Sequence, residues 1–66
     1  MANTILIEKQ EAADEYARDI GGVWIVYGNP NRLNHTLDIR ITQEDCAADF
    51  MLAGDVVLYR TEGVAA

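Results

Sequence analysis

The chain has 66 residues, with eleven acidic and five basic side chains and a net charge of −6. Half of the residues are hydrophobic, which is typical of a globular chain, and the length allows one small domain, residues 1–66. We expect no direct binding to nucleic acid or membrane surfaces, no membrane helix and no signal peptide. The sequence has no cluster of basic residues, no run of roughly 20 apolar residues and no basic segment before an apolar stretch.

The N-terminal third permits two interpretations. Residues 10–20 are helical by composition, and Gly21-Gly22 predicts the end of that helix. Residues 5–7, Ile-Leu-Ile, form either a short strand or the first turn of a helix that runs from about residue 4 to residue 20. The helix would place Ile7 among charged side chains. The strand would leave the following helix without a capping side chain between residues 5 and 13. We favour the strand.

Two strand-like runs follow. Residues 23–27 are β-branched and aromatic, and residues 36–41 alternate strictly, with Leu37 and Ile41 on the same side. Gly, Pro and Asn in the segment 28–34 accept turn geometries. The pattern predicts a β-hairpin with a loop longer than the minimum.

The C-terminal third predicts a helix and then a strand. Thr42 is a suitable N-cap, acidic residues occupy the following turn, and Gly54 is a suitable stop. Residues 55–61 form a strand built on Val-Val-Leu-Tyr. These elements predict an α+β domain in which a small antiparallel sheet of three or four strands carries two helices on one face. With the strand at residues 5–7 the order is βαββαβ, the ferredoxin-like arrangement, which we favour over αββαβ.

Such an architecture leaves one sheet face uncovered, and the strands predict an apolar surface there. Exposed aromatic and β-branched side chains are typical of interfaces. The candidates for an oligomer or partner interface are Trp24, Val26, Tyr27, Val57 and Tyr59.

We expect no catalytic residue, no cofactor and no metal site, and therefore no enzyme. His35 and Cys46 are the single histidine and the single cysteine, whereas a structural zinc site needs four such ligands. His35 follows the loop and is interpreted as a solvated residue, and Cys46 as a small buried hydrophobic one. One cysteine cannot form an intrachain disulfide, which favours the reducing cytoplasm.

The negative charge is concentrated on the two predicted helices. In size and charge the chain resembles the small acidic inhibitors of phages and mobile elements, which block nucleic-acid-handling enzymes such as CRISPR effectors or restriction systems. The resemblance implies an anti-CRISPR-like or anti-restriction-like inhibitor or adaptor in the host cytoplasm. Its carboxylates would occupy a basic protein surface that normally holds phosphates. The candidates are Glu11, Asp14, Glu15, Glu44, Asp45 and Asp49.

Two other interpretations remain open. The acidic side chains are equally compatible with a solvated surface that maintains solubility. The alternative function is a homo-oligomeric structural or regulatory subunit, expected as a homodimer, that assembles through the apolar sheet face.

Overall fold

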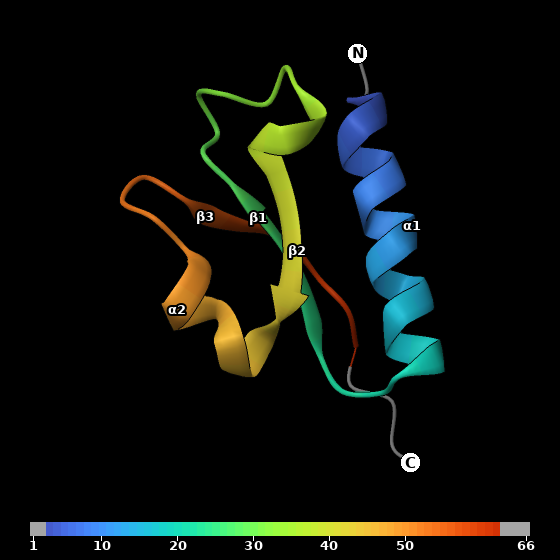
Figure 1. Ribbon diagram of the computed structural model, residues 1–66. Helices are drawn as coiled ribbons and strands as arrows, with labels where there is room; N and C mark the ends of the chain where they lie inside the picture. The colour runs from blue at the N-terminus through green and yellow to red at the C-terminus, as the bar shows by residue number, and fades with distance from the viewer. Residues whose placement is uncertain (1–2, 63–66) are drawn as a thin grey trace.

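A computed structural model describes residues 3–62, and Figure 1 shows the arrangement of the elements. A long helix, α1 (Thr4–Asp19), lies against an antiparallel sheet of three strands, β1 (Trp24–Gly28), β2 (Ile39–Gln43) and β3 (Val56–Arg60). A second helix, α2 (Ala47–Phe50), has a single turn. The chain is therefore an α+β fold with a three-stranded sheet and two helices, and the order of the elements is αββαβ.

The N-terminal segment is helical, so the strand expected over residues 5–7, and with it the favoured βαββαβ order, is wrong. The capping residue is Asn3, which lies before residues 5–13, the segment that contains no capping side chain. Its side-chain oxygen accepts a hydrogen bond from the N–H of Leu6 at 3.1 Å. Ile5 and Leu6 pack against the core, while Ile7 is 41% exposed. A single exposed isoleucine is a common feature of protein surfaces, and so it does not oppose the helix strongly.

The end of α1 agrees with the prediction from the glycine pair. Gly21 and Gly22 adopt φ values of +88° and +86°, which favour glycine and stop the helix. The chain then turns back into β1. The indole N–H of Trp24 donates to the Gly21 carbonyl at 3.0 Å, and its ring lies 5.2 Å from the Tyr16 ring.

β1 and β2 form the predicted hairpin, but the second strand begins at Ile39 and not at residue 36. Residues Thr36–Asp38 form a 3-10 turn, η1, that is capped from both sides. The His35 ring accepts from the Leu37 N–H at 3.3 Å, and the Asp38 carboxylate accepts from the His35 N–H at 3.1 Å. Such local bonds compete with strand pairing, and Leu37 is exposed as a result.

The helix predicted over residues 42–54 is much shorter in the structure. Thr42 lies inside β2 and does not cap a helix, because strand pairing continues to the end of β2. A 3-10 turn, η2 (Glu44–Cys46), leads into α2, and the backbone is already extended at Met51. The Asp55 carboxylate then accepts a backbone N–H from three residues earlier at 2.9 Å, which stabilises a turn in place of further helix.

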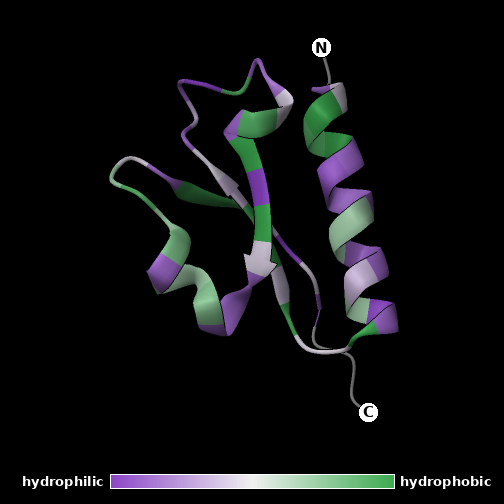
Figure 2. Ribbon diagram, viewed as in Figure 1, coloured by the Kyte–Doolittle hydropathy of each residue, from purple (hydrophilic) through white to green (hydrophobic). Residues whose placement is uncertain are grey.

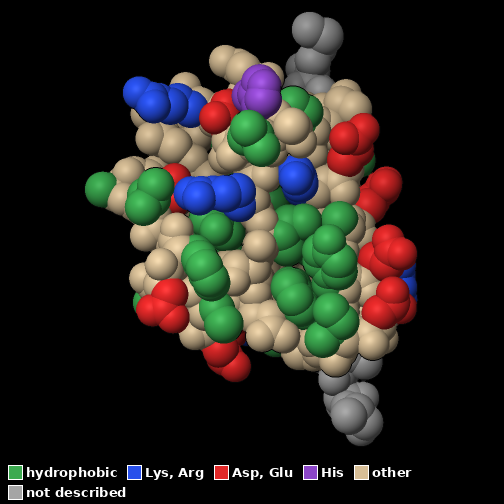
Figure 3. Space-filling model, in the orientation of Figure 1, with side chains coloured by type: hydrophobic (Ala, Val, Ile, Leu, Met, Phe, Trp, Pro, Cys, Tyr) green, Lys and Arg blue, Asp and Glu red, His purple; other side chains and the backbone are tan. Residues whose placement is uncertain are grey.

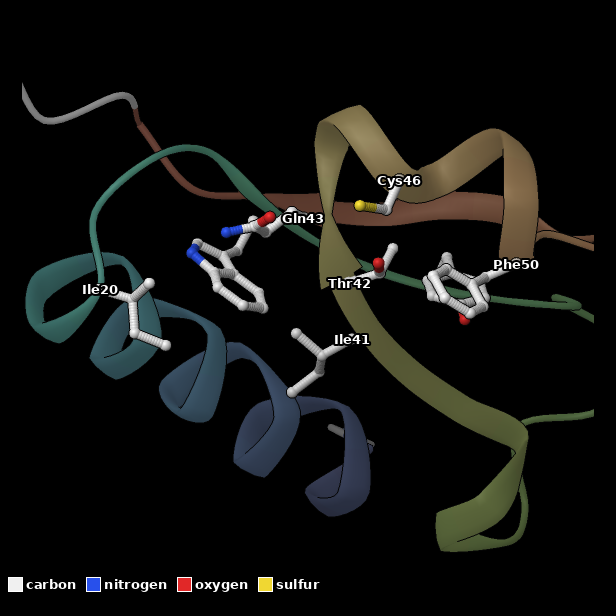
Figure 4. A pocket seen from close by; sticks show the side chains of 8 residues that line it. Ile20, Ile41, Thr42, Gln43, Cys46 and Phe50 are labelled. Carbon is white, nitrogen blue, oxygen red and sulfur yellow. The ribbon is translucent and has the colours of Figure 1, made fainter.

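The two sides of the sheet are covered by different segments. The strand register and the core packing place Trp24, Val26, Ile39, Ile41 and Tyr59 on the side of α1. The opposite side carries Ile25, Tyr27, Arg40, Thr42 and Val57. Figures 1 and 4 show η2 and α2 beside this second side, so the expectation that both helices cover one face is wrong.

Both sides of the central strand are consequently buried. Val26 packs with Ala13 and Ile39 in a core that is closed to solvent, while on the other side Ile25 and Tyr27 are 1% and 3% exposed. Figure 2 shows the alternation of apolar and polar residues along β2 that results from this arrangement. The edge of β2, which faces the viewer in Figure 1, therefore separates two apolar layers.

Candidate interaction surfaces

Four carboxylates follow one side of α1. Glu8, Glu11, Glu15 and Asp19 are spaced three or four residues apart, so they lie on one helix face. That face points away from the buried Ala13 and Ala17, and all four side chains are exposed. We call this set the acidic stripe, and it is about 16 Å long at the rise of an α-helix. In Figure 3 acidic side chains line the outer edge of the molecule where α1 lies.

Two of the six predicted acidic site residues are engaged within the chain. Asp14 accepts a hydrogen bond from the Tyr59 hydroxyl at 2.7 Å, and this bond raises the pKa of Tyr59. Glu44 forms a two-pronged ion pair with Arg60, in which Nη2 lies 3.2 Å from Oε1 and Nε donates to Oε2. The hydrogen bonds from Arg60 lower the pKa of Glu44, and the pKa of Arg60 is raised in return. Asp14 therefore links α1 to β3, and Glu44 links η2 to β3.

The other four predicted acids divide between two surfaces. Glu11 and Glu15 belong to the acidic stripe, whereas Asp45 and Asp49 are exposed on η2 and α2, on the far side of the sheet from α1. The sequence prediction did not include Glu8 and Asp19, which complete the stripe. Their spacing of three or four residues from Glu11 and Glu15 could have identified them. That spacing places all four on one face only if a single helix begins at Thr4, as it does in the structure.

The predicted apolar residues do not form one surface. Trp24, Val26 and Tyr59 lie on the side of α1, and Tyr27 and Val57 lie on the opposite side. Val26 and Tyr27 are buried within the chain, whereas Val57 is half-exposed. Two other exposed apolar side chains, Ile20 and Phe50, lie on either side of the edge of β2.

A shallow hollow of about 430 Å³ lies across that edge. Ile20, Trp24 and Ile41 line it on the α1 side, and Tyr27 and Phe50 line it on the other side, with β2 between them (Figure 4). Ile20 is 63% exposed and Phe50 is 53% exposed. We call this region the β2 edge. It is the place where sheet backbone and apolar side chains reach the surface together.

The single basic residue of β2 is held in place. The Arg40 guanidinium lies 5.1 Å from the centre of the Tyr27 ring and 3.3 Å from the Asp55 carboxylate. The ring and the carboxylate compensate its charge and keep the side chain against the second side of the sheet. Arg40 therefore does not cover the outer edge of its strand.

Residues 3–62 contain no group of three or more His, Cys, Asp or Glu side chains that could hold a metal ion, and none of their helices could span a membrane. Cys46 is half-buried and lines the hollow, and His35 is exposed and caps η1. Neither side chain is placed beside a second group that would activate it as a nucleophile or a base.

Comparison of the chain with protein-family models, curated proteins and solved structures gives no match. Its function is therefore inferred from two features of the fold, the acidic stripe and the β2 edge.

Proposed function

We propose that this chain is a protein-binding domain, an inhibitor or adaptor, that acts in the cytoplasm by covering a basic nucleic-acid-handling surface of another protein. It would belong with the small acidic inhibitors that phages and mobile elements use against CRISPR or restriction enzymes. The supporting observation is the acidic stripe. Its four carboxylates are exposed, and none forms a salt bridge within the part of the chain that the structure describes.

The spacing of the stripe suits a surface that normally holds phosphates. Along α1 the stripe presents one carboxylate per roughly 5.5 Å, compared with one phosphate per about 3.4 Å along a DNA strand. The two linear charge densities are of the same order. A row of Lys and Arg side chains that accommodates phosphates could therefore pair with these carboxylates, and complementary potentials would speed the encounter.

A capture experiment with a DNA competitor tests this function. The wild-type chain is immobilised and exposed to a lysate of host cells, and bound protein is then challenged with a short DNA duplex. We expect the duplex to displace the captured protein. A variant that neutralises the stripe, E8Q/E11Q/E15Q/D19N, should bind about tenfold or more weakly, since four exposed ion pairs contribute about 0.2–1 kcal/mol each.

The matched control changes the same four side chains but keeps their charge. E8D/E11D/E15D/D19E leaves four carboxylates on α1, so it should retain most of the binding. Capture that survives both the duplex and the neutralised stripe would exclude α1 from the mechanism.

Self-assembly into a homodimer, as a structural or regulatory subunit, is the second candidate function. The observation that favours it is the exposure of apolar side chains at the β2 edge, where Ile20 and Phe50 are more than half exposed. The β2 edge replaces the sheet face as the proposed contact because Val26 and Tyr27 are already buried within one chain.

A further inference from the structure

We propose that two copies of this chain pair edge to edge through β2, antiparallel, so that two three-stranded sheets become one continuous six-stranded sheet. The inference rests on the second candidate function, self-assembly, and it specifies the surface and the register. Three features of the β2 edge support it: the direction of its backbone groups, the distribution of charge along it and its exposed apolar flanks.

The outward backbone groups of β2 follow from its pairing with β1. The N–H of Glu44 donates to the carbonyl of Val23 at 2.9 Å, which makes this a hydrogen-bonded pair of the antiparallel ladder. Hydrogen-bonded and non-hydrogen-bonded pairs alternate, so Thr42 and Arg40 also direct their backbone groups to β1. Ile41 and its neighbour Gln43 direct theirs away from β1, toward solvent. An edge of this kind is a template for another strand.

The sequence of β2 allows a symmetric pairing about its middle residue. With a two-fold axis at Ile41, the N–H and C=O of Ile41 bond reciprocally to Ile41 of the second copy. The N–H of Gln43 then faces the carbonyl of Ile39 of the second copy, and the reverse. Arg40 comes opposite Thr42 of the second copy, so no like charges lie directly opposite one another within β2. Beyond the strand, Glu44 comes opposite Asp38 of the second copy, but Glu44 is already paired with Arg60 of its own chain.

The charges at the two ends of β2 favour a second copy over an unrelated strand. Arg32, which forms no salt bridge within residues 3–62, lies in the loop before β2, whereas Asp45 and Asp49 follow the end of β2. Figure 3 shows basic side chains in the upper half of this face with acidic ones beside them, and further acidic side chains at its lower left. Antiparallel pairing places the start of one β2 beside the end of the other. The loop that carries Arg32 in each copy therefore approaches Asp45 and Asp49 of the other copy, and the two surfaces are complementary in charge at these positions.

The β2 edge also lacks the usual protection against pairing. β2 contains no proline and its register with β1 is unbroken, whereas the pairing of β3 with β1 has a register shift between Val26 and Tyr27. On either side of β2, Ile20 and Phe50 would lose water contact against the second copy. Their burial adds an apolar contribution to the backbone bonds.

A proline at Gln43 tests the pairing with little disturbance of the single chain. The φ of Gln43 is −67°, the angle that proline imposes, and its N–H does not bond to β1. Gln43→Pro therefore removes an outward donor and places the proline ring on the edge. We expect the wild type to sediment as a dimer, and the variant to have a dimer dissociation constant about tenfold or more higher, because two symmetry-related bonds are lost. Gln43→Ala is the matched control, since it keeps the N–H and should remain dimeric.

Amide hydrogen exchange gives a second readout that does not depend on a variant. In the pairing proposed, the N–H groups of Ile41 and Gln43 become protected as the concentration rises. Those of Arg40 and Thr42 bond to β1 and are protected at every concentration. This alternation would not arise from contact through helices or loops.

The outcomes separate the inference from the function on which it rests. A wild type that stays monomeric at the highest concentration overturns both self-assembly and the pairing, and leaves the proposal for the acidic stripe in place. A dimer that is unaffected by Gln43→Pro, or equally disrupted by Gln43→Ala, retains self-assembly but overturns pairing through the β2 backbone.

Discussion

The hydrogen bond between Asp14 and Tyr59 shows how a single residue in α1 acquires its role. Asp14 and Glu15 are adjacent and chemically alike, yet Asp14 accepts the bond from β3 while Glu15 points to solvent in the acidic stripe. The partner of Asp14 lies 45 positions away in the sequence. For this reason the sequence could identify the acidic helix but not which of its carboxylates were free, and the same holds for Glu44 and Arg60.

The Asp14–Tyr59 bond predicts a pH-dependent contribution to stability. Tyr59→Phe should lower the free energy of unfolding by about 1 kcal/mol at neutral pH, because the side-chain bond between α1 and β3 is lost. Asp14 stabilises the protonated phenol and so raises the pKa of Tyr59 above its ordinary value of 10.0. The contribution is therefore complete below pH 10 and is lost as the pH rises through the higher pKa of the folded state.

Chemical denaturation of the wild type and Tyr59→Phe at neutral and strongly alkaline pH checks this prediction, and the two should converge in alkali. Tyr16→Phe is the control, because the Tyr16 hydroxyl makes no side-chain hydrogen bond within residues 3–62. Equal losses in the two variants would show that the Asp14 bond contributes nothing specific.

At the scale of elements, the sequence predicted correctly those helix ends and turns that depend on interactions between residues close together in the sequence. The hairpin of β1 and β2 and the end of α1 at Gly21-Gly22 follow from nearby turn residues and were correct. The strand at residues 5–7 was wrong because the position of Ile7 among charged side chains was taken as an objection to the helix, whereas Ile7 is simply exposed and Asn3 caps the helix. The helix after Thr42 was too long because β2 uses Thr42 in the sheet.

Asn3 makes one hydrogen bond to α1 and one to the β1–β2 loop, and substitutions can separate the contributions of the two bonds. Its oxygen caps α1, and its amide N–H donates to the Leu33 carbonyl in the β1–β2 loop at 2.9 Å. Asn3→Ala removes both bonds and should lower the free energy of unfolding by about 1–2 kcal/mol. Asn3→Asp keeps the cap and places a favourable negative charge at the helix N-terminus, so it should cost less. Thermal or urea denaturation of the two variants gives the comparison, and equal costs would assign the whole effect to the bond with Leu33.

At the scale of the whole molecule, the two proposed surfaces are compatible. The acidic stripe faces away from the sheet, while the β2 edge lies at the side of the sheet. The sequence located the acidic residues of α1, but it could not locate the β2 edge, because the strand order β2-β1-β3 depends on pairings between distant residues. In the antiparallel dimer, the two α1 helices lie on the same side of the six-stranded sheet. The dimer would therefore present two acidic stripes on one side.

This arrangement predicts that pairing strengthens partner binding. Two linked stripes that reach one extended basic surface bind with avidity, so Gln43→Pro should weaken capture of the partner relative to Gln43→Ala, although both leave the stripe intact. Binding of the captured protein to each variant, measured above and below the dimer dissociation constant, tests this. Equal binding by the two variants would mean that each stripe acts alone.

The position of β1 between the other two strands also has a consequence for folding during synthesis. β1 is made first, and it can pair with β2 once the loop between them closes. Its other edge has no partner until β3 is made, since Gly28 pairs with Val56. Until then the nascent chain has an open β1 edge in addition to the β2 edge. A neighbouring nascent chain could supply its own β3 to that edge, which would give a strand-exchanged assembly by a route that the finished protein no longer offers.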